Sequence, residues 1–138
     1  MEKIKFDLQA MKIMSLFESI TRAKLKDCII SEKVITFIVE ENEIAKAIGK
    51  KASNVRRLEN SLKRKIKIVE FSDNLAKFIE NLAYPAKIDQ IEQDEKVVKI
   101  KAADTQSRGL LIGREANILR ANEAIVKRYF DIEEIKVL

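Results

Sequence analysis

The residues best suited to chemistry in this sequence follow a glycine that stands after a short apolar segment. In AIGKKASNVRRLE, Gly49 is followed closely by Lys50, Lys51, Arg56 and Arg57. A turn between two helices leaves the first N–H groups of the second helix without intrahelical partners, and anions such as phosphate bind there. Glycine permits a positive φ and lets a ligand backbone approach closely. The stretch therefore predicts a phosphate-binding loop, with a plain helix C-cap as the alternative.

A second stretch, LLIGREANILRANE at residues 110–123, repeats this pattern. With Gly49 aligned on Gly113, seven of the 21 positions in 44–64 are identical, where average composition would give roughly one or two. The residues shared with the second copy are Ile48, Gly49, Ala52, Arg56, Glu59, Lys63 and Arg64. The chain is therefore interpreted as two copies of one unit, each with its own glycine loop.

The positive charge of the chain is concentrated around the first loop. Residues 44–67 contain nine Lys or Arg and the single acid Glu59, a local charge of +8 within a chain whose net charge is +5. Such a segment is the expected electrostatic footprint of a protein that binds a polyanion. A basic face that only contacts solvent is the alternative interpretation.

The composition argues against several classes of site. The chain has no histidine and one cysteine, Cys28, so a disulfide within the chain and a Cys–His zinc site are both excluded. Cys28 lies in an apolar segment and is expected to be buried. No apolar run is long enough to span a bilayer, and no signal peptide is recognisable. We expect an intracellular, cytoplasmic protein that is not an enzyme.

Each half of the sequence predicts the order helix, strand, strand, helix, helix, strand. The first half predicts a helix capped by Asp7, strands at 26–31 and 34–40, helices at 43–48 and from Ser53 or Asn54, and a strand at 65–71. We expect the apolar face of its first helix to contain Leu8, Met11, Met14, Leu16, Phe17 and Ile20.

The second half predicts the same elements again. They are a helix at 74–83 capped by Ser72 or Asp73, strands at 87–92 and 96–102, helices at 106–112 and 116–130, and a strand at 133–138. Two domains are therefore predicted, at residues 1–71 and 72–138, with almost no linker between them.

The two glycine stretches resemble the IGxxG loops of KH domains, RNA-binding modules whose loop holds the backbone of about four nucleotides. The predicted element order is that of the type II KH fold. Two such units, joined by KIKIVEFSDNLAKFIENLAYPAKI, resemble the archaeal NusA-type transcription termination and antitermination factors. The resemblance implies an α+β fold of the α/β sandwich type. Two tandem type II KH domains would each place helices on one face of a three-stranded mixed sheet.

The resemblance also implies a function, namely binding of single-stranded RNA in transcription together with RNA polymerase or a transcription complex. It implies no cofactor, small-molecule substrate or membrane. In the family the loop and the next helix hold the RNA backbone, and an apolar groove beside the adjacent strand takes the bases. The residues so implied in the first unit are Gly49, Lys50, Lys51, Ala52, Asn54, Val55 and Arg56, and Arg57 extends the charged track. In the second unit they are Gly113, Arg114, Glu115, Ala116, Ile118 and Arg120.

The sequence departs from the family pattern inside both loops. The fourth loop position is alanine in both copies, Ala52 and Ala116, and alanine resists a positive φ. Glu115 places a carboxylate where an RNA phosphate would lie, which costs on the order of 1 kcal/mol in a dry contact. We therefore expect the first unit to bind RNA more strongly than the second.

Two other kinds of function fit parts of the sequence. Degenerate loops are compatible with a protein-interaction scaffold that contacts RNA polymerase or ribosome surfaces and has vestigial RNA-binding loops. Helix–glycine–helix units also enter the major groove of duplex DNA, although the flanking strands argue against that use here. Competition between duplex and single strand separates the nucleic-acid alternatives.

Overall fold

The computed structural model describes the backbone of residues 2–138 and the side chains of residues 8–138. The chain divides into two compact units, Met1–Ser72 and Asp73–Leu138, which are described here one after the other. None of the helices in residues 2–138 is long and apolar enough to cross a membrane.

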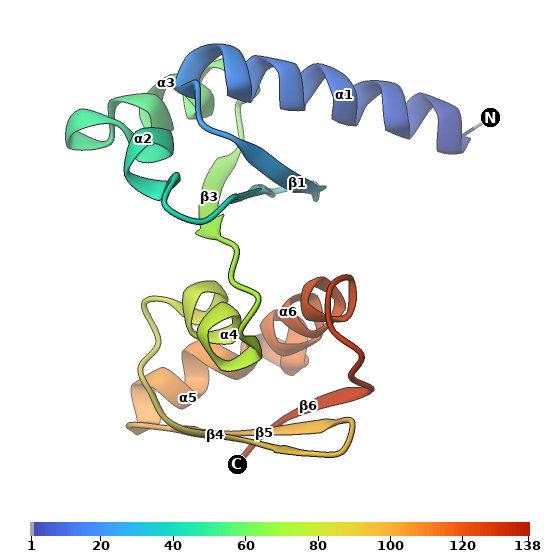
Figure 1. The fold of residues 1–138 in the computed structure, drawn as a ribbon, viewed down its shortest axis with the longest axis vertical. Coiled ribbons are helices and arrows are strands. Elements are labelled where there is room, and N and C mark those ends of the chain that lie inside the picture. The colour runs from blue at the N-terminus through green and yellow to red at the C-terminus, as the bar shows by residue number, and fades with distance from the viewer. Residues whose placement is uncertain (1) are drawn as a thin grey trace. The chain divides into compact units, whose positions relative to one another are not determined.

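The first unit contains three helices and a three-stranded sheet (Figure 1). Its elements are α1 (Glu2–Thr21), β1 (Leu25–Ile30), β2 (Val34–Val39), α2 (Ile44–Ile48), α3 (Ser53–Leu62) and β3 (Lys65–Glu70). The central strand β2 pairs antiparallel with β1 and parallel with β3. The sheet is therefore mixed, as the type II KH order requires.

The core of the first unit lies between its helices and one face of the sheet. Phe17 of α1 stacks on Phe37 of β2, with ring centroids 4.3 Å apart. Ala47 of α2 and Leu58 of α3 join the same buried cluster and are fully buried. Cys28 is buried beside Phe37, its partner in the strand register, as the sequence predicted. These contacts fix the turn between α2 and α3 against the sheet.

The second unit repeats this architecture. Its elements are α4 (Leu75–Ala83), β4 (Ile88–Asp94), β5 (Val97–Ala102), α5 (Thr105–Ile112), α6 (Asn117–Lys127) and β6 (Glu134–Val137). Strand β5 is central, antiparallel to β4 and parallel to β6. The predicted fold class of two three-stranded mixed sheets with helices on one face is confirmed.

A buried carboxylate joins helix α6 to strand β6 in the second unit. Glu123 is 9% exposed. Its Oε2 accepts a hydrogen bond of 2.8 Å from the backbone N–H of Ile135, and Arg120 Nη1 lies 3.3 Å from the same oxygen. The charged side chain is tolerated there because both of these partners are donors.

Three local predictions about helices are wrong. Helix α1 begins at Glu2, so Asp7 lies within the helix and is not its N-cap. Asn74, not Ser72 or Asp73, caps α4, because it directly precedes the first helical residue and accepts a hydrogen bond from Lys77 N at 2.9 Å. Helix α6 ends at Lys127 and not at Phe130.

The predicted apolar face of α1 is also partly wrong. Leu8 and Met11 are exposed, at 54% and 62%, whereas Ile13 and Phe17 are the buried apolar residues of this helix within residues 8–21. The first part of α1 extends past the sheet of its own unit (Figure 1). Met14 and Ile20 pack against the core only partly.

Candidate nucleic-acid interface

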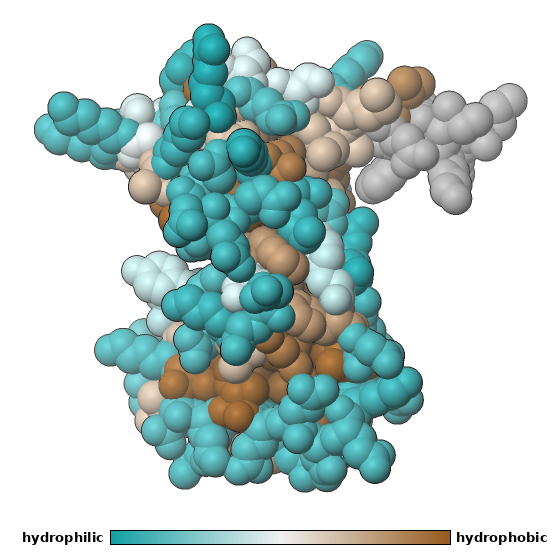
Figure 2. Space-filling view, in the orientation of Figure 1, coloured by the Kyte–Doolittle hydropathy of each residue, from teal (hydrophilic) through white to brown (hydrophobic). Residues whose placement is uncertain are grey.

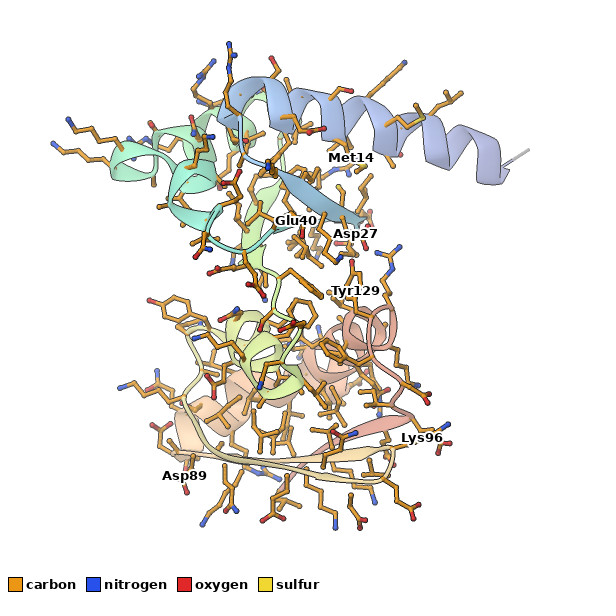
Figure 3. The ribbon with its side chains drawn as sticks, viewed as in Figure 1. Met14, Asp27, Glu40, Asp89, Lys96 and Tyr129 are labelled. Carbon is orange, nitrogen blue, oxygen red and sulfur yellow. The ribbon has the colours of Figure 1, made fainter. Side chains whose placement is uncertain are left out.

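The first glycine loop is a tight turn between α2 and α3. The Gly49 N–H donates to the carbonyl of Ala45 at 3.0 Å, which ends α2, and a 3₁₀ turn over Lys50–Ala52 leads into α3. Figure 3 shows this turn at the far end of the first unit from the start of α1, with long side chains directed away from the ribbon. Lys50 and Lys51 are both exposed. The loop therefore presents two lysines to solvent.

The backbone at both loop glycines has a conformation that other residues rarely adopt. Gly49 has φ 78° and ψ 169°, and Gly113 has φ 73° and ψ −178°. A Cβ at Gly49 would lie 2.8 Å from Asn54 Nδ2, and one at Gly113 would lie 2.6 Å from Ile118 Cγ1. Backbone angles and space both require glycine at these two positions. The glycines end a helix and also shape the loop, so the two interpretations are not exclusive.

The alanine at the fourth loop position is left-handed in both copies. Ala52 has φ 59° and Ala116 has φ 62°, and the residues before them, Lys51 and Glu115, are left-handed too. A non-glycine residue in this region costs roughly 1–2 kcal/mol. The loop thus keeps a conformation that its own residues disfavour, because the flanking helices are fixed by the core.

Two N–H groups of the first loop already have acceptors inside the turn. Ala52 N–H donates to the carbonyl of Gly49 at 3.1 Å, and Ser53 N–H donates to that of Lys50. The second loop has the same two bonds, from Ala116 and Asn117. The expectation that the first N–H groups of the following helix are all free is therefore wrong for these groups. These two N–H groups are therefore not free for a phosphate, whereas the side chains of Lys50 and Lys51 are exposed.

The other predicted residues of the first unit have different roles in the fold. Arg56 and Arg57 are exposed on the first turns of α3 and continue the charged surface from the loop. Asn54 Nδ2 donates to the Lys46 carbonyl at 3.1 Å and so ties α3 to α2. Val55 is half-buried and packs against the core. Among the residues predicted in the first unit, only the lysines and arginines therefore present charged groups to solvent.

The second loop carries a different surface on the same backbone. Leu110 and Ile118 are exposed, at 42% and 38%, where the aligned residues of the first unit are Lys46 and Asn54. Arg114 and Glu115 are both exposed, so opposite charges are neighbours in this loop. The surface around Gly113 is therefore more apolar and less basic than the surface around Gly49.

The arginine shared by the two copies is also held differently. Arg120 forms an ion pair with Glu123, with 3.3 Å between Nη1 and Oε2. Arg56, its counterpart, forms no ion pair among residues 8–138. A phosphate at the second site would compete with Glu123 for Arg120, whereas Arg56 has no such competitor.

A narrow apolar hollow lies between the helices and the sheet of the second unit. It is small, with a volume of about 10 Å³, which is room for about one water molecule. Its lining residues come from α4, α5, α6, β5 and β6: Ile79, Leu82, Ala83, Ile100, Leu111, Leu119, Asn122, Val126, Ile135 and Val137. Figure 2 shows apolar surface on the second unit between hydrophilic rims.

Asn122 lines this hollow and Glu123 pairs with Arg120, and neither residue was among those predicted from the sequence. Asn122 stands where the first copy has Leu58, which is fully buried. A polar residue at a position that is apolar in the other copy was the available signal. Glu123 gave no such signal, since its counterpart Glu59 is also a glutamate.

The comparisons with known proteins agree with this architecture. The KH domain family matches residues 12–73, which is most of the first unit. A Methanocaldococcus jannaschii protein named probable transcription termination protein NusA is 29% identical, with 100% of this chain and 77% of that protein aligned. Proteins of the same name from Halococcus morrhuae and Thermoplasma acidophilum are 28% and 25% identical. Their alignments cover 93% and 99% of this chain, and 94% and 97% of those proteins.

A solved structure shares the whole arrangement of the fold. The crystal structure of APE1850 aligns with a TM-score of 0.76 and 26% identity, covering 95% of this chain and 99% of that one. The similarity in sequence and in fold therefore extends over both units. The chain thus has the fold of two tandem type II KH domains and is similar over nearly its whole length to archaeal proteins named probable transcription termination protein NusA.

Proposed function

We propose that this protein is a single-stranded RNA-binding transcription factor whose first KH unit holds the RNA backbone. The observation that carries this proposal is the exposed basic surface formed by Lys50, Lys51, Arg56 and Arg57 on a loop and helix start of fixed geometry. The relatives are named for transcription termination, which supports a role in transcription.

The chemistry of the loop suits a phosphate backbone. Lysine ammonium groups bind phosphates as point charges, and arginine side chains bind them with several donors. Single-stranded RNA is flexible enough to follow a short turn and the first turns of a helix, and its backbone charge supplies most of the affinity. The second unit adds less charge, so its contribution to backbone binding is smaller.

The cellular role follows from the same proposal. The protein acts in the cytoplasm in transcription elongation, termination or antitermination, in contact with RNA polymerase or a transcription complex. It binds and positions RNA and catalyses no reaction. The names of the archaeal relatives support the transcription role, and the absence of any histidine supports a non-catalytic one.

The test is binding to a pool of short single-stranded RNAs at two salt concentrations. We compare the wild type with Lys50→Asp/Lys51→Asp, and with Lys77→Asp/Lys136→Asp as a control of equal charge change at exposed lysines of the second unit. If both loop lysines contact phosphates, the loop variant loses at least about tenfold in affinity, and the slope of log K against log salt falls by about 1.4. Equal affinity of the loop variant and the wild type would overturn the proposal.

A second candidate function rests on the apolar surface around the second loop. Leu110 and Ile118 expose apolar area where the first copy is polar or basic. Such a surface is typical of a protein contact, so a scaffold for polymerase or ribosome surfaces is the alternative. RNA binding that is undetectable in the assay above would favour the scaffold.

A further inference from the structure

Three basic residues at the far end of α3 from the first loop take no part in the loop contact proposed above. Lys63 and Arg64 connect α3 to β3, and Lys65 is the first residue of β3. Lys63 and Lys65 are exposed, and Arg64 is half-buried. None of the three forms an ion pair within residues 8–138. Part of the positive charge of the segment 44–67 is therefore placed away from the glycine loop.

The turn between β1 and β2 adds a fourth cation at the same place. Lys65 N–H donates to the Lys33 carbonyl at 3.1 Å, and Arg64 Nη1 donates to the Ser31 carbonyl at 3.4 Å. Lys33 is exposed, and Glu32 is the one acid in these two turns. Backbone hydrogen bonding thus holds four cations together. We call this set the basic turn surface, which consists of Lys33, Lys63, Arg64 and Lys65.

One side of α3 connects the basic turn surface to the glycine loop. Arg56, Asn60 and Lys63 follow one another at intervals of four and three residues, so they lie along the same side of the helix. All three are exposed, and Glu59 is the single acid of α3. A helix of ten residues is about 15 Å long. A strand that contacts both ends of α3 therefore extends beyond the nucleotides at the loop.

The same place in the second unit has the opposite charge. Glu134 is the counterpart of Lys65, because Val97 pairs with Glu134 as Val34 pairs with Lys65. The residues around this turn of the second unit are Asp94, Glu95, Lys96, Val97, Asp131 and Glu133, and Lys96 is paired with Asp131 at 3.4 Å. The two units share the arrangement of the turns and differ in charge. The fold therefore does not require the four cations of the first unit.

We propose that the basic turn surface binds phosphates of the same single-stranded RNA, beyond the nucleotides at the first loop, an inference that rests on the proposed function of RNA binding. Lysine and arginine side chains both bind phosphate, and each phosphate they neutralise adds to the salt dependence of binding. The exposed side of α3 favours RNA over an acidic protein segment, because it joins this surface to the loop cations. The acidic counterpart in the second unit repels the strand.

The test compares oligoU of four nucleotides, the length that a KH loop holds, with oligoU of sixteen nucleotides. Fluorescence anisotropy measures binding at two salt concentrations. The variants are Lys63→Glu/Lys65→Glu and the neutral pair Lys63→Gln/Lys65→Gln. Lys77→Glu/Lys136→Glu is the control with the same change of charge at exposed lysines of the second unit. Thermal unfolding shows that each variant is folded, and the neutral pair replaces the glutamate pair if the latter is not.

For the sixteen-nucleotide RNA, we expect the glutamate pair to bind at least about tenfold more weakly than the control. The neutral pair lowers the slope of log K against log salt by about 1.4. For the four-nucleotide RNA, both variants stay within about twofold of the control, because the loop alone holds it.

Two results would overturn the inference while the proposed function stands. One is binding of the long RNA that matches the control, which would leave an acidic protein segment as the ligand of this surface. The other is an equal loss for both lengths, which would mean that the turn and the loop act on the same nucleotides. A wild type that binds neither RNA would instead overturn the proposed function, and this inference with it.

Discussion

At Gly49 the backbone φ and ψ are 78° and 169°, and at Gly113 they are 73° and −178°. Two residues after each glycine the backbones match as closely, since Lys51 and Glu115 are both left-handed, at φ 52° and 54°. Yet one of these side chains is a cation and the other an anion. Glycine and the packed helices therefore fix the loop backbone, and the loop side chains differ between the two units without changing it.

The largest effect is expected from replacing either loop glycine. Gly49→Ala or Gly113→Ala puts a Cβ into a positive-φ position and within 2.9 Å of neighbouring side-chain atoms. We expect each variant to lose about 2–3 kcal/mol of unfolding free energy in urea titration, from backbone strain and crowding. Similar losses of stability at both sites would mean that glycine fixes the backbone of both loops in the same way. A loss at one site alone would show that the two loops are not fixed in the same way.

The next largest effect is expected to differ between the two glutamates that the copies share, Glu59 and Glu123. Glu123→Ala removes the acceptor for the Ile135 N–H and is expected to cost about 1–3 kcal/mol. Glu59→Ala is the matched control, because the Glu59 side chain forms no hydrogen bond or ion pair within residues 8–138, and it should change stability by less than about 0.5 kcal/mol. Urea titration of both variants measures the difference. Equal losses would mean that the carboxylate on α6 does not anchor β6.

A charge exchange between the loops tests the functional side of the comparison. The double variant Lys51→Glu/Glu115→Lys leaves the net charge of the chain unchanged. It makes the loop of the second unit the more basic of the two. If the first loop dominates backbone binding, the exchanged protein loses affinity for single-stranded RNA by roughly tenfold, or about 1.4 kcal/mol. The single variant Glu115→Lys should gain affinity. Unchanged binding in both would show that neither loop charge faces RNA.

The element order and the repeat could be predicted from the sequence because they depend on local patterns. A continuous run rich in β-branched residues marks β2, alternation of lysine and isoleucine marks β3, and the glycines mark the ends of α2 and α5. The face of α1 could not be predicted in this way. Apolar residues occur around much of this helix, and the sheet decides that Ile13 and Phe17 are buried while Met11 is exposed.

The candidate site could be predicted only in part, for a similar reason. The lysines and arginines of the first loop are recognisable by charge and spacing, and the structure exposes Lys50, Lys51, Arg56 and Arg57. Neither the turn that uses the N–H of Ala52 nor the shape of the hollow has a local sequence signal, although Asn122 differs from its aligned residue Leu58. Both depend on how the helices pack on the sheet, which periodicity does not specify. The contact roles of the loop residues remain predictions.

A smaller effect is expected from giving either loop its second glycine. Ala52→Gly or Ala116→Gly relieves a left-handed alanine, a gain of roughly 1–2 kcal/mol that the flexibility of the unfolded glycine chain reduces to about 0.5–1 kcal/mol. Urea titration should show this gain in both units. RNA affinity should rise only for Ala52→Gly, since the first loop dominates backbone binding. A loss of stability would mean that the alanine methyl groups make contacts that outweigh the strain.

The smallest effect concerns the third glycine, which the second unit has and the first does not. Gly109 lies within α5, is exposed, and a Cβ there would meet no atom within 4 Å. Its aligned residue in α2 is Ala45, so the repeat itself shows that alanine is compatible with this helix position. Because glycine is a poorer helix former, Gly109→Ala should stabilise the protein by about 0.5–1 kcal/mol, raising the urea midpoint. The opposite sign from Gly113→Ala, four residues further on, would show that the requirement for glycine comes from the loop backbone and not from the surroundings of α5. A destabilised Gly109→Ala protein would contradict the prediction, because it would mean that helix propensity does not decide the effect at this position.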